Sequence, residues 1–481
     1  MTKKRILMIH PSFKGLKFGD EWEGLDSLAA PLGLMYIATP LINSGYDVKF
    51  IDFNVDRLTK EKFFNEISEA KYLLLSCYSD SLKSVYEIIK IARKINKDIF
   101  IMCGGPYCKL TGNYVAGSDL TVIGEAEEII VDLFDRLNKK DSLSNIPGLI
   151  YKKGDKIIRN KGCLEAKDIN RSIGSSHILT KDKNYGMFFG YRVKGLIGTM
   201  TSRGCPYNCN FCTHKGSINN KIVRKRTVDN VIAELKDLEK NGTRYVIFYD
   251  DNFLIDKKRV NSIMDRIIQE KIKLKLIVQG RVDSADYNFY KKLYRAGVIM
   301  IAFGIENANQ DVLDYYNKGT SVEQIRKAIE IADKVGIITM GFFMIGSPIE
   351  DKKHFQINKK FINNIPLDVI HISILEYLEG SNLWEKAVKE GKISKNETSV
   401  VSNEKLSKYS YKEWIDMRDD LLDGFYKKPK RILRGTYKVL KRGFLIEFIK
   451  ILWVGRKGFV KKSKNAFFVE APDSKIEVLT K

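Results

Sequence analysis

The sequence predicts an α/β protein with two successive sets of parallel strands, followed by a basic helical region. Short apolar strand segments alternate with helical patterns over residues 1–140, and the alternation returns with a longer period over residues 195–400. Strands that are apolar at every position are typical of parallel sheets with helices on both faces. We therefore expect a doubly wound parallel sheet first, a second α/β domain after it, and a helical region over residues 401–481.

The first domain contains five strand candidates and four helix candidates in alternation. The strands are expected at Arg5–His10, Asp47–Asp52, Tyr72–Ser76, Ile99–Cys103 and Leu120–Ile123. The helices are expected at Leu32–Asn43, Lys60–Ala70, Ser81–Lys94 and Glu127–Leu137. Ligands of doubly wound sheets bind at the carboxyl ends of the strands. The small and polar residues that follow three of the strands are therefore candidate ligand contacts, although ordinary turns have the same composition: Ser76, Ser79, Gly104, Gly105, Pro106, Gly124 and Glu125.

Residues 141–194 are expected to connect the two domains. A β-hairpin is predicted over residues 148–158, around a turn that contains Gly154. The remainder is polar and irregular. We assign no chemistry to it, and we expect none of Cys163.

The second domain has six strand candidates, separated by helical patterns such as Val228–Asn241 and Val322–Val335. The second of these helices follows Thr320, and Glu323 stands three residues later, which is the spacing of a capping box. The strands are expected at Leu196–Thr201, Tyr245–Tyr249, Lys275–Gln279, Val298–Gly304, Thr339–Ile345 and Val369–Ile374. Six units are too few to close an eight-stranded barrel, so we expect a partial (β/α)6 barrel. Parallel barrels place their chemistry at the carboxyl ends of the strands, where five candidate residues stand: Asp250, Asp251, Arg281, Gly304 and Glu306.

Three cysteines, Cys205, Cys209 and Cys212, follow the first strand of the second domain. Their spacing is C-x3-C-x2-C, with Phe211 directly before the last of them. Thiolates ligate iron–sulfur clusters, and because no fourth cysteine lies nearby in the sequence, one iron of a cubane cluster would stay open. Structural zinc is an alternative, but it usually needs a second cysteine pair or histidines, and only His214 is near. Free buried thiols are a second alternative, although the surrounding Pro, Asn and Gly residues are typical of a loop.

At these cysteines the chain resembles the radical S-adenosylmethionine (SAM) enzymes, whose motif is C-x3-C-x2-C with an aromatic residue before the last cysteine. The resemblance implies a [4Fe–4S] cluster on the three thiolates, with SAM chelated to the open iron. It implies that Phe211 lies near the adenine and that Arg281 faces the carboxylate of SAM. It also implies that the ends of two other strands contact the amino group or the ribose, through Asp250, Asp251, Gly304 and Glu306. Solvated loop charges are the alternative for the polar residues in this set.

The first domain resembles the cobalamin-binding domain of cobalamin-dependent radical SAM enzymes. The similarity lies in Ala30-Pro31-Leu32-Gly33-Leu34, in the Gly104-Gly105-Pro106 turn and in the Gly124-Glu125-Ala126-Glu127 turn. It implies a flavodoxin-like or Rossmann-like domain that holds cobalamin at the seven strand-end residues given above. The Asp-x-His-x-x-Gly motif that ligates cobalt in other cobalamin proteins is absent, because Met8 and Phe13 stand where the Asp and Gly should be. We therefore expect that no histidine ligates cobalt and that His10 is a satisfied core or loop residue.

Charge and cysteine usage indicate the location and the partners of the protein. The formal net charge is +23, and residues 427–464 hold fourteen Lys or Arg residues against one acidic residue, Glu447. Apolar residues recur between these cations over Ile432–Trp453, which predicts either a basic helix for a membrane or acidic surface, or a helix packed on the barrel. Seven cysteines without a paired framework indicate a reducing compartment. Because no signal peptide or membrane span is recognisable, we expect a cytoplasmic protein, with peripheral membrane contact as one option.

The resemblance implies an oxygen-sensitive enzyme that methylates an unactivated carbon of a small-molecule or lipid-like substrate through a deoxyadenosyl radical. Its cofactors would be a [4Fe–4S] cluster, SAM and cobalamin, and a flavodoxin-type or ferredoxin-type donor would supply electrons. A ring-forming or oxidative cyclase with the same cofactors is the alternative. A tRNA methylthiotransferase would need a second cluster on three further cysteines; Cys77, Cys103 and Cys108 could be mistaken for these, but we place them at the strand ends of the parallel sheet. A cobalamin or iron sensor would leave the barrel without a role, and no helix-turn-helix or aromatic–basic platform indicates a nucleic-acid partner.

Overall fold

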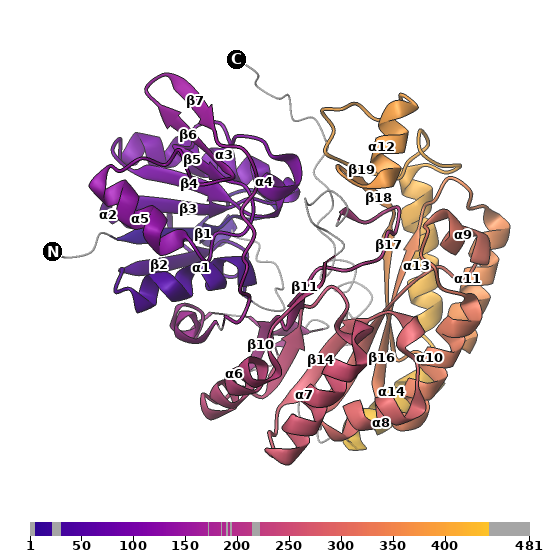
Figure 1. Ribbon diagram of the computed structural model, residues 1–481. Coiled ribbons are helices and arrows are strands. Elements are labelled where there is room, and N and C mark those ends of the chain that lie inside the picture. The colour runs from indigo at the N-terminus through magenta and orange to yellow at the C-terminus, as the bar shows by residue number, and fades with distance from the viewer. Residues whose placement is uncertain are drawn as a thin grey trace. The chain divides into compact units, whose positions relative to one another are not determined.

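The computed structural model describes residues 5–21, 30–171, 173–183, 185–188, 191–192, 195–213 and 222–441. The chain forms two compact units, of which the first ends at residue 194 and the second begins at residue 195 (Figure 1). Each unit has its own main sheet and its own hydrophobic core. Within the described ranges, no helix has both the length and the apolar character that a membrane crossing requires.

The first unit contains a seven-stranded sheet in the order β2-β1-β3-β4-β5-β6-β7. Its first five strands are parallel, as predicted, and they lie at β1 (Ile6–His10), β2 (Val48–Asp52), β3 (Tyr72–Ser76), β4 (Phe100–Gly104) and β5 (Leu120–Val122). Ile6 stands opposite both Val48 and Tyr72, so β1 is a central strand. The strand order reverses between β1 and β3, which is where doubly wound sheets bind their ligands.

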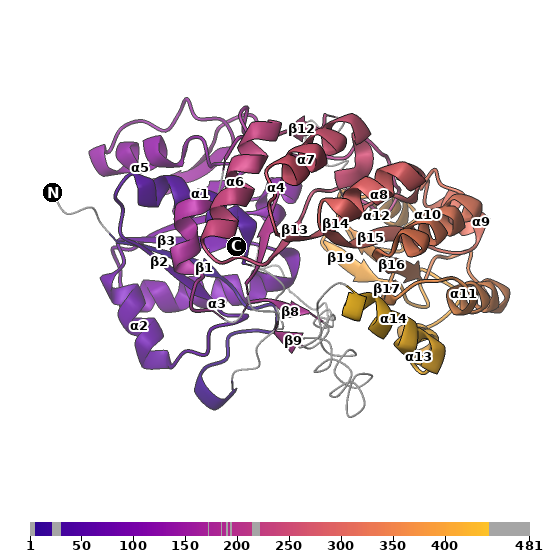
Figure 2. The ribbon, with the colours of Figure 1, turned by 90° about the horizontal axis from the view of Figure 1, so that it is seen from below.

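Helices cover both faces of this sheet because its strands are apolar on both sides. On one face, α2 (Lys60–Glu69) and α3 (Leu82–Ile95) pack against β1, β3 and β4. On the other face lie α1 (Leu32–Asn43) and α5 (Ile130–Lys139), where the rings of Tyr72 and Phe134 meet edge to face at 4.7 Å. Figure 2 shows the strands between these two pairs of helices. A short helix that the sequence pattern did not predict, α4 (Pro106–Thr111), follows β4.

The predicted hairpin forms at β6 (Leu149–Lys153) and β7 (Lys156–Arg159). We expected it within the connector, but β6 pairs antiparallel with β5, so the hairpin extends the first sheet. The physical reason is that Leu149 and Ile150 are fully buried in this position. The rest of this region holds a 3-10 helix, η3 (Gly174–Leu179), and the two-residue strands β8 (Met187–Phe188) and β9 (Tyr191–Arg192).

The second unit contains a six-stranded parallel sheet in the order β10-β13-β14-β15-β16-β17, which confirms the partial barrel. The strands are β10 (Leu196–Thr199), β13 (Tyr245–Phe248), β14 (Lys275–Gly280), β15 (Val298–Glu306), β16 (Ile338–Ile345) and β17 (Val369–Ile374). Figure 1 shows helices along the outer side of this curved sheet. They are α6 (Val228–Lys240), α7 (Lys257–Gln269), α8 (Tyr287–Arg295), α9 (Gln310–Tyr315), α10 (Val322–Val335) and α11 (Lys352–Asn364).

Helix α10 has the predicted bounds, but its N-cap lies one residue after the predicted cap, Thr320. Ser321 is the N-cap residue: its hydroxyl oxygen accepts from the amide of Gln324, and its own amide donates to the Gln324 side chain, which together form a capping box. Thr320 with Glu323 has the same spacing, so the sequence offered two overlapping capping boxes, and the chain uses the second.

After β17 the chain forms β18 (Glu376–Leu378), α12 (Asn382–Lys389), β19 (Ser399–Val401), α13 (Tyr411–Tyr426) and α14 (Pro429–Lys441). Helix α13 covers the open edge of the barrel sheet, because the Tyr426 hydroxyl hydrogen-bonds both the amide and the carbonyl of Ile370 in β17. These two hydrogen bonds pair backbone groups of β17 that would otherwise be open to pairing with a further strand.

Helix α14 is the described part of the predicted basic helix Ile432–Trp453, and residues 442–464 of the basic segment lie outside the described ranges. Its cations bind the barrel. The ammonium of Lys438 is 2.6 Å from Asp333 and 2.7 Å from Asp368. Arg431 and Arg434 donate to the carbonyl of Leu367. In this stretch the structure agrees with the alternative of a helix packed on the barrel.

Candidate functional site

The three cysteines lie on a loop that follows β10 and the two-residue strand β11 (Ser202–Arg203). Gly204 begins the loop with φ of +98°, and its amide donates to Asp251 at 2.7 Å. A Cβ at Gly204 would lie 2.7 Å from the carbonyl oxygen of Ile222, so only glycine fits. Cys209 is buried, whereas Cys205 and Cys212 are partly exposed. The loop therefore presents its thiols at the carboxyl ends of the barrel strands.

Asp250 anchors the chain just before this loop. Its carboxylate is fully buried and accepts hydrogen bonds from the amide and the hydroxyl of Thr201, each at 2.6 Å, and from the Ser202 hydroxyl. Burial raises the pKa of this carboxyl group, while those hydrogen bonds oppose the shift. Asp250 thus positions the entry to the loop, and its predicted contact with SAM stays a prediction, as does that of Asp251.

Asn210 ties the middle of the loop to two distant elements. Its amide donates to the carbonyl of Tyr316 at 2.8 Å, and its side chain donates to the carbonyl of Tyr315 at 2.7 Å. Its carbonyl accepts from the amide of Leu383 at 3.0 Å, and its side-chain oxygen accepts from Asn382 at 2.9 Å. The loop is therefore fixed between the end of α9 and the start of α12.

Arg281 lies against the same loop from the end of β14. Its guanidinium carbon is 3.6 Å from the centroid of the Tyr207 ring, and its Nε donates to Asp283 at 3.0 Å. The Tyr207 hydroxyl also donates to Asp283, at 3.1 Å. Arg281 is 5% exposed, and its Nη1 is buried without a hydrogen-bond partner among the described residues. A buried guanidinium N–H without a partner fits a ligand carboxylate.

Glu306, at the end of β15, forms a buried ion pair with Lys318, with 2.6 Å between Oε1 and Nζ. The pair lies over Gly304, where a Cβ would approach Glu306 Oε1 at 2.8 Å and Lys318 Nζ at 2.9 Å. Glu306 has φ of +66°, at a register shift between β15 and β16. The predicted SAM residues Gly304 and Glu306 are thus brought together, and the glycine makes room for the ion pair.

Phe211 packs next to this ion pair. Its ring centroid is 5.4 Å from that of Tyr316 and 5.8 Å from the Lys318 ammonium. It also borders a small core formed by residues of α9, β18 and α12. This position within the loop is compatible with the predicted place near an adenine, which stays a prediction.

The three thiols are a donor set that suits an iron–sulfur cluster. Among the described residues, no three His, Cys, Asp or Glu side chains are arranged to hold one metal ion, and His214, the histidine of the zinc alternative, lies outside them. A cubane cluster binds each thiolate at a separate iron, so its ligands need not converge on one point. Burial raises the pKa of the Cys205 and Cys209 thiols, and at Cys209 the Lys318 and Arg281 cations oppose that shift.

The predicted ligand edge of the first unit is partly open. Ser76 ends β3 and is buried, Ser79 begins the 3-10 helix η2 (Ser79–Ser81) and is half-buried, and Pro106 is exposed. Gly105 has φ of +113°, and a Cβ there would lie 3.0 Å from the backbone of Cys77. The half-exposed Gly104 and Gly105 therefore bring accessible backbone to the strand ends, which fits a large flat ligand.

Gly124 and Glu125 have a packing role in the same unit. A Cβ at Gly124 (φ +109°) would lie 2.0 Å from the carbonyl oxygen of Leu164, so this glycine is required by the following segment. Glu125 is 3.3 Å from the Lys109 ammonium and accepts from the amide of Ala166 at 3.1 Å. Their contact with cobalamin stays a prediction.

Among the described residues, only one of the two ring nitrogens of His10, at the end of β1, has a polar partner. Its Nδ1 is 3.1 Å from Asp52, which also accepts from the Tyr185 hydroxyl at 2.7 Å. Its Nε2 is buried and makes no hydrogen bond to the described residues, which the sequence did not predict.

Three thiols of this unit, those of Cys77, Cys103 and Cys108, are fully buried in its apolar core.

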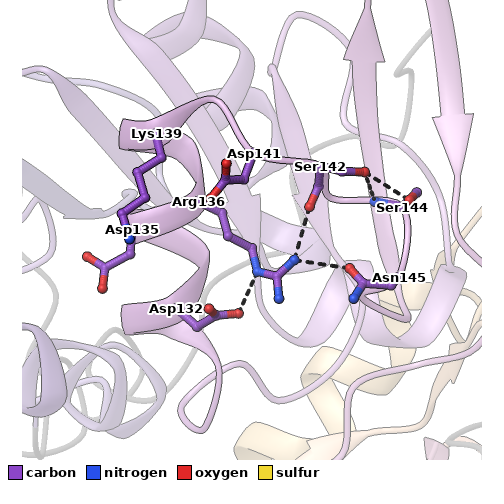
Figure 3. Close-up of a pocket in the computed structure, with 8 residues that line it drawn as sticks. All are labelled: Asp132, Asp135, Arg136, Lys139, Asp141, Ser142, Ser144 and Asn145. Carbon is purple, nitrogen blue, oxygen red and sulfur yellow. Dashed lines mark hydrogen bonds and ion pairs between the residues drawn. The ribbon is translucent and has the colours of Figure 1, made fainter.

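A polar hollow of about 580 Å³ lies at the end of α5 (Figure 3). Arg136 bridges it, with hydrogen bonds to Asp132 at 2.8 Å, to the carbonyl of Ser142 at 3.1 Å and to Asn145 at 3.2 Å. These contacts fasten the loop after α5 to the helix. The hollow contains none of the predicted site residues.

Sequence reasoning missed Asn210, Asp283 and Lys318, which the structure places against the cysteine loop. Asp283 and Lys318 stand outside every recognised motif, and their roles depend on contacts across the fold. Asn210 lies inside the cysteine motif, but the bonds it makes are to residues 105 or more positions away.

Two family models match the chain. The model of the Radical SAM superfamily matches residues 199–362, and the model of the B12 binding domain matches residues 25–134. The first match contains the cysteine loop and four complete strands of the barrel, β13 to β16, and the second contains the strand-end turns of the first unit.

Among curated proteins, the chain is similar to an uncharacterized methyltransferase of Pyrococcus horikoshii. The two are 28% identical, over 92% of this chain and 96% of that protein. The chain is also similar to the anaerobic magnesium-protoporphyrin IX monomethyl ester cyclase of Cereibacter sphaeroides, with 26% identity over 73% of this chain and 58% of that protein.

Among solved structures, the chain is similar to the radical SAM methyltransferase TsrM of Kitasatospora setae, solved with its tryptophan substrate and a SAM analogue. The TM-score is 0.65 at 17% identity, and the match covers 81% of this chain and 77% of that one. At this identity the likeness supports the fold.

Proposed function

The chain is a radical SAM enzyme with an N-terminal cobalamin-binding domain, and from this premise we propose that it methylates an unactivated carbon atom. Its cofactors are a [4Fe–4S] cluster, SAM and cobalamin. When bound, the cluster supplies the electron that cleaves SAM, and cobalamin carries the methyl group. The protein contributes the binding, orientation and enclosure of these groups.

The residues of the second unit divide this work. Cys205, Cys209 and Cys212 would hold the cluster, and the free Nη1 of Arg281 would donate to the carboxylate of SAM. Asp250 holds the entry of the loop through Thr201 and Ser202. Glu306 would accept from the ammonium of SAM, and this would compete with its ion pair to Lys318.

The residues of the first unit would hold cobalamin at the open edge of Ser76, Ser79 and Gly104–Pro106. The half-exposed backbone there supports close approach of a large ring. No histidine is expected below the cobalt, because Nε2 of His10 is buried and its Nδ1 is occupied by Asp52.

The observation that supports methylation most strongly is the similarity to a methyltransferase over nearly the full length of both chains. The balanced reaction consumes one substrate C–H bond, two SAM molecules and two electrons. The products are a new C–CH3 bond, deoxyadenosine with methionine from one SAM, and S-adenosylhomocysteine from the other. An external one-electron donor of the flavodoxin or ferredoxin class supplies the electrons.

Ring formation is the second candidate, because the chain is similar to a cyclase over 73% of its length. That reaction would consume SAM only by cleavage to deoxyadenosine. The methylthiotransferase alternative has less support, since Cys77, Cys103 and Cys108 are packed as core thiols without exposure.

The substrate is proposed to be a small molecule or a lipid-like molecule, and no nucleic-acid partner is proposed. The cytoplasmic location stays a prediction, as does peripheral membrane contact through residues 427–464. In the described part of that segment, Arg431, Arg434 and Lys438 are engaged by the barrel. Any membrane contact would therefore depend on the remaining cations.

Anaerobic reconstitution tests the cofactor assignment. The wild-type chain should bind about four irons, the content of a cubane cluster. The variant with Cys205, Cys209 and Cys212 all changed to Ala should bind none. Stoichiometric zinc in protein purified without oxygen would contradict the assignment.

Electron paramagnetic resonance of the cobalt(II) form tests the cobalamin site. The spectrum should lack nitrogen coupling from a protein histidine, and His10→Gln should leave it unchanged. Nitrogen coupling that His10→Gln removes would overturn the proposed absence of a histidine ligand. If the protein fails to retain cobalamin, it would instead be assigned to the radical SAM enzymes that work without cobalamin.

A further inference from the structure

The turn Tyr315–Lys318 holds Cys209 from both sides. The residue after Cys209, Asn210, is bonded to the carbonyls of Tyr315 and Tyr316. The residue before it, Asn208, accepts at its carbonyl from the Asn317 side chain at 2.8 Å. Three consecutive residues of the turn thus fix the backbone around the central cysteine, and Lys318 follows them directly.

This arrangement brings the Lys318 ammonium close to the cysteine loop. Lys318 is 6% exposed, and its Nζ is 5.8 Å from the centroid of Phe211, which stands between Cys209 and Cys212. The paired carboxylate of Glu306 is also largely buried, at 12% exposure of its side chain. Solvent therefore screens these two charges much less than it screens a surface pair.

Other contacts fix the position of the pair. The Lys318 carbonyl accepts from Arg281 Nη2 at 2.7 Å, which links the turn to β14. Gly304 leaves the space that the two charged ends occupy. The backbone of Lys318 is held by Arg281, its ammonium is held by Glu306, and Gly304 provides the space for its charged end. Its charge is therefore fixed in position and is not solvated.

We propose that the Lys318–Glu306 pair sets the reduction potential of the cluster that the proposed function assigns to Cys205, Cys209 and Cys212. The potential of such clusters depends on net charge, hydrogen bonding and exposure. Taking up one electron adds negative charge to the cluster. The Lys318 cation favours the reduced state, and the Glu306 anion opposes it. Lys318 is in this sense a positioning residue whose charge acts through the cluster.

The test compares Glu306→Gln with the double variant Glu306→Gln, Lys318→Met, since neither leaves a buried carboxylate unpaired. Each protein is reconstituted without oxygen and titrated with dithionite, in the absence of SAM, and the reduced cluster is counted by electron paramagnetic resonance. Glu306→Gln should have a higher midpoint potential than the wild type. The double variant should return toward the wild-type value.

Lys386→Met is the matched control. Its ammonium lies 5.7 Å from the ring of Tyr315 in the same turn, but its side chain is 61% exposed, so removing this charge should shift the potential far less. If the double variant does not take up a cluster, the comparison of Glu306→Gln with the wild type still tests the proposal, which requires a higher midpoint potential in Glu306→Gln.

Equal potentials in cluster-loaded Glu306→Gln, its double variant and the wild type would overturn the assignment of Lys318 and leave the proposed function intact. A shift in Lys386→Met as large as that between Glu306→Gln and the double variant would also overturn it. A wild-type chain that binds no iron would instead overturn the proposed function on which the assignment rests.

Discussion

Asn210 uses its amide, its carbonyl and both ends of its side chain to hold the cysteine loop. Replacing it with Ala removes two side-chain bonds and leaves the Tyr315 carbonyl and the Asn382 amide group without these partners. Each lost partner costs on the order of 1–3 kcal/mol when the group stays buried. We expect Asn210→Ala to fold but to retain less iron after anaerobic reconstitution and desalting.

Asn382→Ala is the graded control for this prediction, since it removes only one of the two bonds. Iron per chain should fall in the order wild type, Asn382→Ala, Asn210→Ala. Full iron retention by Asn210→Ala would show that the backbone bonds alone are sufficient.

The ion pair Arg226–Glu234 stabilises the chain before the loop. Both side chains are 2% exposed, with 2.6 Å between Arg226 Nη1 and Glu234, and the same Nη1 donates to the carbonyl of Met200 at 2.9 Å. Removing one partner of a buried pair costs about 3–5 kcal/mol, because a charge stays buried without compensation. Glu234→Ala should therefore lower the urea midpoint of unfolding strongly.

Glu270→Ala breaks the more exposed pairs of Glu270 with Arg266 and Lys236, and it should lower that midpoint much less than Glu234→Ala does. Comparable losses in the two variants would contradict the importance of burial at Glu234.

At the scale of elements, the first turn of α11 contains a pH-dependent link to α9. His354 lies 2.7 Å from the N-cap residue Asp351 and 2.8 Å from Asp311. Burial lowers the pKa of His354, but hydrogen bonds and charge from Asp311 and Asp351 outweigh this and raise it. Protonated His354 therefore stabilises the folded state below the ordinary pKa of about 6.5, and this contribution is lost as the pH rises through the raised pKa.

His354→Gln should accordingly lower the urea midpoint most at about pH 6, and the difference from wild type should shrink as the pH rises. Lys353→Gln, which removes a charge from the same turn, should give a difference that depends little on pH. A His354→Gln deficit that grows with pH would contradict the sign of this linkage.

Long helices and short apolar strands could be predicted from the sequence. The bounds of α1, α10, β3 and β17 agree with the predicted ranges, because the two helices are long enough to show an apolar period and the two strands are short, mainly apolar segments. Helices α4 and α9 were not predicted, since six residues are too short for a clear period. The hairpin was predicted, but its pairing with β5 was not, because pairing depends on residues distant in sequence.

At the scale of the whole molecule, the parallel topology explains why part of the site could be predicted. The carboxyl ends of parallel strands share one edge, so Asp250, Arg281 and Glu306 were expected near Cys205–Cys212, and the structure brings them there. The turn that holds Cys209 could not be predicted. Its bonds join residues 105 to 109 positions apart and use backbone carbonyls, which every residue has.

The central claim is that one chain uses SAM in two ways, with cleavage at the cysteine loop and methyl donation to cobalamin. It is tested most directly without substrate, by loading wild-type protein with cluster and cobalamin, adding reductant and SAM, and quantifying both products. The account predicts deoxyadenosine together with S-adenosylhomocysteine, the latter about equal to the bound cobalamin, and no deoxyadenosine from the triple Cys→Ala variant. Deoxyadenosine without S-adenosylhomocysteine would contradict methylation and favour ring formation.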